Sequence, residues 1–472
     1  MRRWTTLGLL AALWIGCGEA GGGGGADADA ADGTAPEEIA DDGAADPDTE
    51  DGAEGDEGVD MEGDAGDDGD ASLPPTQNWQ RDIRAIALEV DLSTLQAAAA
   101  ITLDASDAAG ASFEAGGLTV MGVSDAAGGP LEYLVTDGRL DVGAPASQVT
   151  LTVDYGFTVQ ADFEGWSSRG WTLMWPNHCG NLFPCHSSPA EGQTFALEVL
   201  GVAEGQVAVH PDAIPADAPS YQIAWAVGDY AWRQIGATAA GTLVGAWTQP
   251  GGETAAATGM ADLPAVFDWY ERTLGPYPFG GRAGALAVVW PLGAYGGMEH
   301  HPFWHVSQAA MGDRAVHVHE ASHGWFGDGV RIARWEDLVL SEGTACYLTA
   351  RSLGQVVGPD AETAIWDGYA AELTGILAHS DRVAWPDPIA DPAELNDFLF
   401  SRVTYIKGAY FYEAVADAVG AAEIDRVLGL FFAAHAGEAA GMQDLVDLIE
   451  SETGFDTTAP VEGWLRGLGR PD

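Results

Sequence analysis

Apolar and polar residues alternate along most of residues 79–251. The alternating stretches lie between turns rich in Gly and Asp, and they are IRAIALEV (83–90), AAAITL (98–103), LTVMGV (118–123), LEYLV (131–135), VTLTVDY (149–155), FALEVLG (195–201) and QVAVH (206–210). A period of two residues puts successive side chains on opposite faces of an extended strand. Short strands at this spacing predict an antiparallel β-sheet domain.

From residue 261 onward the period becomes helical. LPAVFDWYERTL (263–274) predicts an amphipathic helix that ends before Gly275 and Pro276, and ALAVVW (285–290) predicts a buried strand. The stretches at 405–419 and 442–452 predict further helices. We therefore expect a multidomain chain: an N-terminal antiparallel β-sheet domain over residues 77–252, and an α+β, mainly helical domain over residues 253–472.

The first seventeen residues have the pattern of an export signal. Arg2 and Arg3 precede the apolar run LGLLAALWIG, which is too short to span a bilayer, and Cys17 follows it. The pair Gly16-Cys17 resembles a bacterial lipoprotein processing site, which implies a lipid anchor on Cys17. The alternative is an ordinary cleaved signal in which Cys17 has no role. We expect export to the cell envelope and attachment to a bacterial membrane.

Residues 18–76 are rich in Gly, Ala and Asp and contain no Lys, Arg or aromatic residue. Such a segment buries too little apolar surface to offset the entropy of ordering, so it predicts a disordered linker. The whole chain has 72 acidic and 19 basic residues and a formal net charge of −53. This charge disfavours nucleic acid as a partner, because binding to phosphates depends on Lys and Arg.

Candidate chemistry is concentrated in VHVHEASHGWFGDGVRIARWEDLVLSEG (316–343). His319 and His323 lie one turn apart on a helix, so both imidazoles can reach one cation. Glu320 lies beside that cation, where it can accept a proton from water. A catalytic zinc site needs a third protein ligand and an open position. Glu342, separated from His323 by eighteen residues, is the predicted third ligand.

The complete string resembles the gluzincin aminopeptidases, the family of aminopeptidase N. It reads His-Glu-x-x-His, then eighteen residues, then Glu, with Trp-Phe-Gly after the second histidine and Trp-x-Asp-Leu-x-Leu-x-Glu-Gly around the glutamate. The resemblance implies a thermolysin-like catalytic domain, one Zn²⁺ per chain bound by His319, His323 and Glu342, and peptide substrates. It also implies that the large C-terminal helical domain of full-size members does not follow.

A second motif resembles the family's Gly-x-Met-Glu-Asn strand, whose backbone pairs with an extended substrate. The predicted substrate-binding residues are Gly296, Gly297, Met298 and Glu299. The resemblance implies that Glu299 binds the substrate's α-amine, whereas the residues alone also allow a solvated turn glutamate. His300 replaces the family's Asn, and Trp175 stands where the family has a Gln or Glu that shares the amine.

Tyr405 lies in TYIKGAYFY, which matches the family's Tyr-x-Lys-Gly-Ala motif. The resemblance implies that its hydroxyl stabilises the tetrahedral oxyanion, because a neutral phenol can donate a hydrogen bond to a developing charge. Tyr410 and Tyr412 are interpreted as packing residues. Cys179 and Cys185 are close enough in sequence for a disulfide, which export would permit.

These patterns predict a tethered, exported zinc metallopeptidase that removes amino-terminal residues from peptides. Glu320 and Tyr405 are the predicted catalytic residues. One alternative is an endopeptidase or other hydrolase on the same site, because Trp175 leaves the amine anchor incomplete. A second is a zinc-stabilised surface binding protein without turnover. Nothing in the pattern indicates the oligomeric state.

The lipid anchor is directly testable. If Cys17 is acylated, the exported protein should partition into the detergent phase, and Cys17→Ser should release it or block its processing. The measurement is phase partitioning together with the intact mass. A mature protein that is cleaved elsewhere and carries no acyl mass would contradict the anchor.

Overall fold

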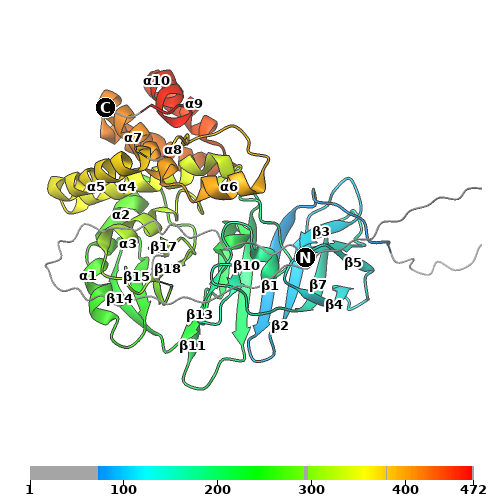
Figure 1. Cartoon of the computed structure of the whole chain (residues 1–472). Helices are drawn as coiled ribbons and strands as arrows, with labels where there is room; N and C mark the ends of the chain where they lie inside the picture. The colour runs from blue at the N-terminus through cyan, green and yellow to red at the C-terminus, as the bar shows by residue number, and fades with distance from the viewer. Residues whose placement is uncertain (1–72, 292–295, 379, 470–472) are drawn as a thin grey trace, which may run out of the picture. The chain divides into compact units, whose positions relative to one another are not determined.

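The computed structural model describes residues 73–291, 296–378 and 380–469. The predicted export signal, Cys17 and nearly all of the predicted linker lie outside these residues. Figure 1 shows strands in the first half of the described chain and helices in the second half. This order agrees with the predicted fold class.

The N-terminal domain is built on a six-stranded sheet with the order β12-β10-β1-β2-β7-β4. Its strands are β1 (Ile83–Asp91), β2 (Gln96–Leu103), β4 (Thr119–Asp125), β7 (Val149–Gly156), β10 (Gln193–Leu200) and β12 (Ala213–Ala218). Ile86, Leu88 and Val90 of β1 are buried while their neighbours are more exposed, as the alternation predicts. The sheet is not purely antiparallel, because β1 and β10 pair in parallel. Strands so far apart in sequence can meet in either direction, which a local pattern does not reveal.

Smaller sheets complete this domain. They are the three-stranded β3-β6-β5 (Ala111–Glu114, Arg139–Val142, Tyr133–Thr136) and the pairs β8-β9 (Gly165–Trp166, Thr172–Leu173) and β11-β13 (Val207–Val209, Ala226–Gly228). Cys179 and Cys185 form a disulfide, which their spacing in the sequence allows. The disulfide lies in the segment between β9 and β10. The backbone of Cys185 in this segment forms a β-bridge with the backbone of Glu114.

A second sheet of five strands has the order β14-β15-β16-β18-β17. Its strands are β14 (Ala231–Ala237), β15 (Leu243–Thr248), β16 (Arg282–Val288), β17 (Gly297–Met298) and β18 (Phe303–Ser307). The predicted boundary at residues 252 and 253 cuts through this sheet. Because β15 pairs with β16 along five residues, the pairing assigns β14 and β15 to the second domain.

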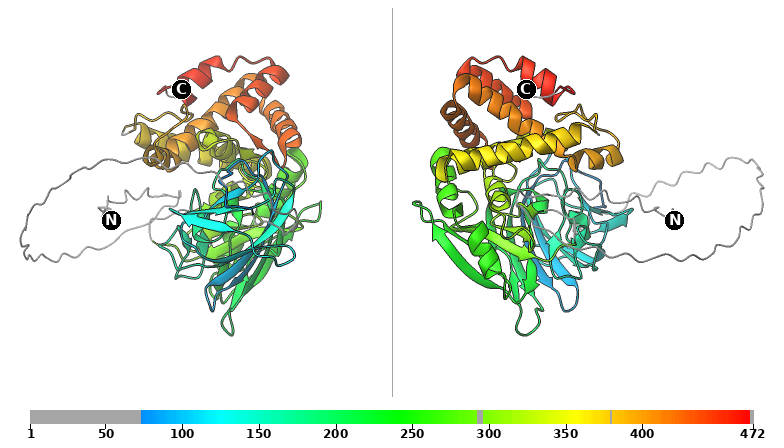
Figure 2. Two further views of the ribbon diagram at one scale, coloured as in Figure 1. Left: turned by 90° about the vertical axis from the view of Figure 1, so that its right-hand side faces the viewer. Right: turned by 60° about the vertical axis from the view of Figure 1, so that its left-hand side comes forward.

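The remaining chain is mainly helical. Its helices are α1 (Glu253–Gly259), α2 (Leu263–Thr273), α3 (Arg314–Ser322), α4 (Thr344–Val356), α5 (Pro359–Leu377), α6 (Pro392–Leu399), α7 (Arg402–Val419), α8 (Ala421–His435), α9 (Met442–Thr453) and α10 (Thr458–Pro460). The predicted helices at 263–274, 405–419 and 442–452 correspond to α2, α7 and α9. Helices α4, α5 and α7 pack against one another, and the long α5 is prominent in the right-hand view of Figure 2. Among the described residues, no helix combines the length and apolar character needed to span a membrane.

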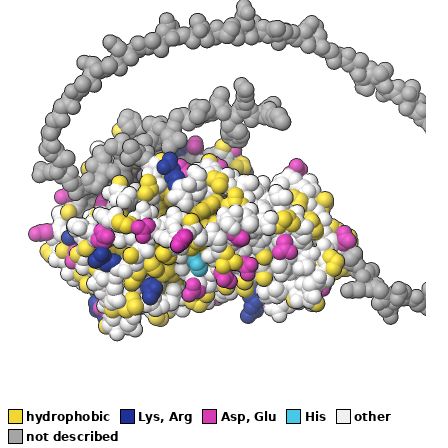
Figure 3. Space-filling model, turned by 90° about the horizontal axis from the view of Figure 1, so that it is seen from below, with side chains coloured by type: hydrophobic (Ala, Val, Ile, Leu, Met, Phe, Trp, Pro, Cys, Tyr) yellow, Lys and Arg dark blue, Asp and Glu magenta, His cyan; other side chains and the backbone are white. Residues whose placement is uncertain are grey.

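The molecular face in Figure 3 carries scattered charges. Its few Lys and Arg side chains lie apart from one another among Asp and Glu side chains. On this face there is therefore no continuous basic surface of the kind that binds a phosphate backbone.

Arg331 connects the two domains. It lies on the short strand β19 (Arg331–Ile332), which pairs in parallel with β20 (Ala439–Ala440). Its guanidinium donates hydrogen bonds to the carbonyl oxygens of Ala190 and Asp217 in the N-terminal domain and of Gly437 in the second domain. The side chain is buried, so these carbonyls depend on Arg331 as a donor.

Arg331→Met should therefore lower the free energy of unfolding by about 3 kcal/mol, because it leaves several buried carbonyls without a donor. Thermal and urea unfolding, followed by circular dichroism, measure this change. The matched control is Arg84→Met, which removes an exposed ion pair with Asp104 and should change stability by less than about 1 kcal/mol. Equal effects of the two substitutions would contradict the role assigned to Arg331.

Candidate active site

Helix α3 carries the first two predicted zinc ligands. The helix begins after Asp313, whose carboxylate accepts a hydrogen bond from the Ala315 N–H at 2.9 Å. His319 lies within the helix and His323 caps its C-terminal end. Their Nε2 atoms are 3.3 Å apart, so the predicted spacing does bring the two imidazoles to one point.

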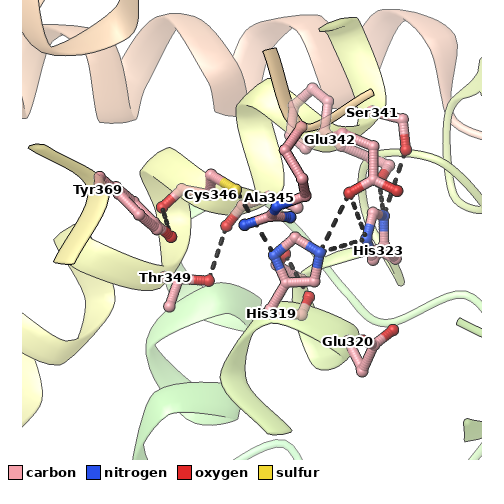
Figure 4. A network of polar contacts seen from close by, with 12 residues as sticks. His319, Glu320, His323, Ser341, Glu342, Ala345, Cys346, Thr349 and Tyr369 are labelled. Atoms are coloured by element: carbon pink, nitrogen blue, oxygen red, sulfur yellow. Dashed lines mark hydrogen bonds and ion pairs between the residues drawn. The ribbon is translucent and has the colours of Figure 1, made fainter. Parts of the chain in front are cut away.

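Glu342 reaches the same point from a different segment. It lies in a π-helical turn, Val339–Gly343, directly before α4. One carboxylate oxygen is 3.1 Å from His319 Nε2 and 3.6 Å from His323 Nε2. Figure 4 shows this carboxylate facing both imidazoles. Helix α4 begins at Thr344, two residues after Glu342.

The π-helical turn packs tightly against α7. A side chain at Gly343 would lie 2.7 Å from the Gly408 Cα, and one at Gly408 would lie 2.6 Å from the Gly343 Cα. The two glycines therefore allow the backbones of the π-helical turn and α7 to touch. This contact fixes the position of Glu342 relative to α7.

The three side chains fit a zinc ion. Their ligand atoms lie within 4.8 Å of one another, and two imidazoles with one carboxylate are a donor set that zinc accepts. Burial lowers the pKa of His323, but the carboxylates of Glu342, Glu299 and Glu320 together outweigh burial and raise that pKa to about 10. Burial likewise raises the pKa of Glu342, but His323 and His319 together outweigh it, so the net pKa of Glu342 is lowered. The point where the donor atoms meet is thus one that favours positive charge.

Neutral groups orient the two imidazoles. His323 Nδ1 donates to the Phe326 carbonyl at 2.9 Å and is 3.3 Å from the Ser341 hydroxyl. His319 Nδ1 is 3.9 Å from the Cys346 thiol. These contacts leave each Nε2 free to face the metal position.

Asp337, close to the motif, makes contacts with the C-terminal helices. Asp337 accepts hydrogen bonds from the Trp385 indole at 2.9 Å and the Met442 N–H at 3.2 Å. It thereby joins the segment before Glu342 to the C-terminal helices. Asp328 is completely buried rather than solvated.

Glu320 and Glu299 lie next to the zinc ligands. Polar atoms of Glu299, Glu320 and His323 all lie within 4.8 Å of one another. A side chain at Gly297 would lie 2.4 Å from a Glu320 carboxylate oxygen, so glycine is needed for Glu320 to lie against β17. Burial raises the pKa of Glu320 well above its usual range, against the opposing effect of His323. Burial also raises the pKa of Glu299.

The predicted substrate strand lies at the side of the five-stranded sheet. Gly297 and Met298 form β17, the last strand in the described sheet order, and pair with β18. Gly296 extends this edge, where its carbonyl accepts a hydrogen bond from the Ser307 N–H. An edge strand can pair with an extended peptide. Glu299 follows β17 directly, so the structure places it between the sheet edge and the zinc ligands.

Tyr405 lies on α7 and reaches the same site. Its ring is nearly parallel to the His319 imidazole, with centroids 6.3 Å apart and an interplanar angle of 15°. Burial, together with Glu342, raises the pKa of Tyr405, so the phenol keeps its proton and can donate it. Tyr410 and Tyr412 have packing roles, as predicted: Tyr410 contacts the Trp366 ring and the Tyr412 hydroxyl contacts Thr344.

The amine end of the site contains a residue that the sequence motifs missed. Tyr221 of the N-terminal domain is buried, and its hydroxyl is close enough to Glu299 to lower the pKa of that carboxyl, against the larger effect of burial. Its ring lies 6.0 Å from that of Trp335, which in turn lies 5.9 Å from Trp175. Tyr221 belongs to no motif, so only the fold could identify it.

Metal analysis can separate the ligands from the neighbouring base. The purified protein should hold one zinc ion per chain, and His323→Ala should lose it because only two of three protein ligands remain. Glu320→Gln should keep its zinc, since all three ligands are intact, and serves as the matched control. Elemental analysis measures both. Zinc loss from Glu320→Gln, or full occupancy in His323→Ala, would show that the ligands are misassigned.

Comparisons with known proteins agree with this geometry. Residues 268–464 match the Peptidase family M1 domain. The chain is 30% identical over 161 residues to Tricorn protease-interacting factor F2 of Thermoplasma volcanium, and 31% identical over 169 residues to Aminopeptidase N of Streptomyces lividans. These alignments cover 33% and 35% of this chain and 20% of each relative. The matched part is therefore about one fifth of the length of these relatives.

A solved structure shares nearly the whole described fold. The M1 zinc metallopeptidase from Deinococcus radiodurans superposes with a TM-score of 0.72 at 18% sequence identity, covering 83% of this chain and 95% of that one. The alignment includes an N-terminal β-sheet domain and a helical domain, which confirms the predicted fold class. Residues 268–464 thus form a domain of peptidase family M1, the gluzincin family of aminopeptidase N.

Proposed function

We propose that this protein is a zinc-dependent aminopeptidase, which hydrolyses amino-terminal residues from peptides. The observation that carries this proposal is the position of Glu299. Its buried carboxylate follows the edge strand β17 and lies within 4.8 Å of Glu320 and His323. A peptide paired with β17 would bring its first residue to this carboxylate, and a free ammonium group would neutralise it. An internal segment of a peptide would place an uncharged amide there instead.

The residues divide the reaction among them. A zinc ion held by His319, His323 and Glu342 would supply Lewis-acid chemistry, by acidifying water and polarising the scissile carbonyl. Glu320 takes a proton from the attacking water and later gives it to the leaving amine. Burial raises the pKa of Glu320, which suits a group that must hold the proton between these two steps.

Two further groups would stabilise the substrate and its transition state. The Tyr405 hydroxyl donates a hydrogen bond to the carbonyl oxygen as negative charge develops on it. Glu299 binds the substrate's ammonium group, and the Tyr221 hydroxyl lies beside the Glu299 carboxylate. This Tyr221 contact comes from the N-terminal domain, so amine recognition would depend on both domains.

The nearest rival is an endopeptidase or another hydrolase on the same site. Trp175 replaces the amide or carboxylate that the resemblance implies, so Glu299 would bind the amine without that second group. A zinc-stabilised binding protein is less consistent with the site. Such a protein has no need of a buried Glu320 beside the metal position or of a phenol beside His319.

We also propose that the protein is exported and lipid-anchored through Cys17. The support is the pattern of residues 1–17 together with the Cys179–Cys185 disulfide, a bond typical of oxidising compartments. Its substrates would then be peptides in the cell envelope.

The role of Glu299 distinguishes an aminopeptidase from its rival. A charge-assisted hydrogen bond to the substrate ammonium contributes about 1.5–3 kcal/mol, so Glu299→Ala should lower kcat/KM for free-amine substrates about tenfold to a hundredfold. Amino-acetylated substrates should be cleaved slowly by the native protein and should be nearly unaffected by the substitution. The measurement uses fluorogenic amino-acid amides beside acetylated peptides.

Two results would reject the aminopeptidase and keep the zinc chemistry. One is a native protein that cleaves acetylated peptides as fast as free ones. The other is a Glu299→Ala variant that loses both activities equally.

A further inference from the structure

Arg402 occupies a position beside Tyr405 that none of the motifs explains. It is the first residue of α7, directly after Ser401, whose hydroxyl caps the helix by accepting from the Val403 N–H. Residues three apart on a helix share a face. The Arg402 guanidinium carbon accordingly lies 4.4 Å from the centre of the Tyr405 ring, within the range of a cation–π interaction.

Glu372 of α5 holds this guanidinium in place. Its two carboxylate oxygens accept from Arg402 Nε at 2.7 Å and from Nη2 at 3.1 Å. A bidentate pair of this kind fixes orientation as well as distance. The Arg402 side chain is only 20% exposed, so water screens its charge incompletely.

The charge of Arg402 reaches the reacting groups. Its guanidinium carbon lies 4.4 Å from the centre of the Tyr405 ring, and that ring lies 6.3 Å from the His319 imidazole. Three carboxylates, those of Glu299, Glu320 and Glu342, line the same site. A fixed cation on the Tyr405 side would offset part of this negative charge where an oxyanion must form.

An ion pair that joins two helices does not need the contact that Arg402 makes with the Tyr405 ring. Arg351 of α4 forms a similar bidentate pair with Asp425 of α8, with a shortest distance of 2.8 Å and both side chains 13% exposed. That pair joins two helices without stacking on Tyr405. The difference between the two arginines is therefore the contact with the phenol.

We propose that Arg402 is a positioning residue for Tyr405: clamped by Glu372, its guanidinium orients the phenol ring and polarises the hydroxyl toward the oxyanion. A cation over the ring face draws electron density from it and makes the O–H a stronger hydrogen-bond donor. The inference rests on the proposed peptidase function and adds a residue to it. Tyr405 remains the group that touches the reacting atoms.

A kinetic double-mutant cycle tests this role. Arg402→Met should lower kcat about 5- to 30-fold with KM within about twofold, because the interaction strengthens in the transition state. In a Tyr405→Phe background, the same substitution should lower kcat by less than about twofold, since the hydroxyl on which it acts is gone. Arg402→Lys should keep more of kcat than Arg402→Met, because it keeps a cation.

The matched control is Arg351→Met. It removes a comparable buried pair, so it should lower the melting temperature about as much as Arg402→Met but keep the native kcat. If Arg351→Met lowers kcat equally, or if Arg402→Met is as harmful in Tyr405→Phe as in the native background, the role of Arg402 is structural and the proposal is overturned.

A binding measurement complements turnover. In zinc-loaded Glu320→Gln, Arg402→Met should weaken a phosphinic dipeptide, which imitates the tetrahedral oxyanion, by about 5- to 30-fold in calorimetry. It should leave the affinity of the corresponding amide substrate within about twofold. Equal weakening of both ligands would overturn the proposal. A native protein that neither cleaves peptides nor binds the phosphinic dipeptide would instead reject the peptidase function, and this inference with it.

Discussion

The structure depends on bringing three charged or ionisable groups together inside the protein. His319, His323 and Glu342 are buried or nearly so, and burial of a carboxylate or a charged imidazole is costly unless opposite charge compensates it. The opposite pKa shifts of His323 and Glu342 express this dependence. A bound cation would satisfy all three groups at once, so the packing of the surrounding helices and the binding of metal are coupled.

Close backbone contacts determine where His319, His323 and Glu342 meet. The π-helical turn that carries Glu342 touches α7 at Gly343 and Gly408, and α7 carries Tyr405. The positions of Glu342 and Tyr405 are therefore linked through one contact between glycines. On the other side, Gly297 makes room for Glu320 against β17. The position of Glu320 thus depends on a glycine in the edge strand.

The N-terminal domain contributes to the site as well as to the fold. Tyr221 lies beside Glu299, and Trp175 and Trp335 continue the aromatic contacts toward Phe400, before α7. Arg331 links the same two domains through hydrogen bonds to buried carbonyl groups. Separation of the domains would consequently disturb the surroundings of Glu299 before it disturbed His319, His323 and Glu342, which all belong to the second domain.

The sequence by itself determined what depends on local spacing. Alternation located strands such as β1 and β7, helical periodicity located α2, α7 and α9, and the interval between His319 and His323 was enough to place both imidazoles on one face. Glu342, Glu299 and Tyr405 were identified through longer motifs. In each case several neighbouring residues match the motif, and these neighbours distinguish the residue from others of its type. The tertiary structure alone decided the parallel pairing of β1 with β10, the transfer of β14 and β15 to the second domain, the position of Tyr221 near Glu299, and the pairing of Arg402 with Glu372. Most of these are contacts between segments far apart in the chain, and topology and close packing, rather than any local period, bring such segments together.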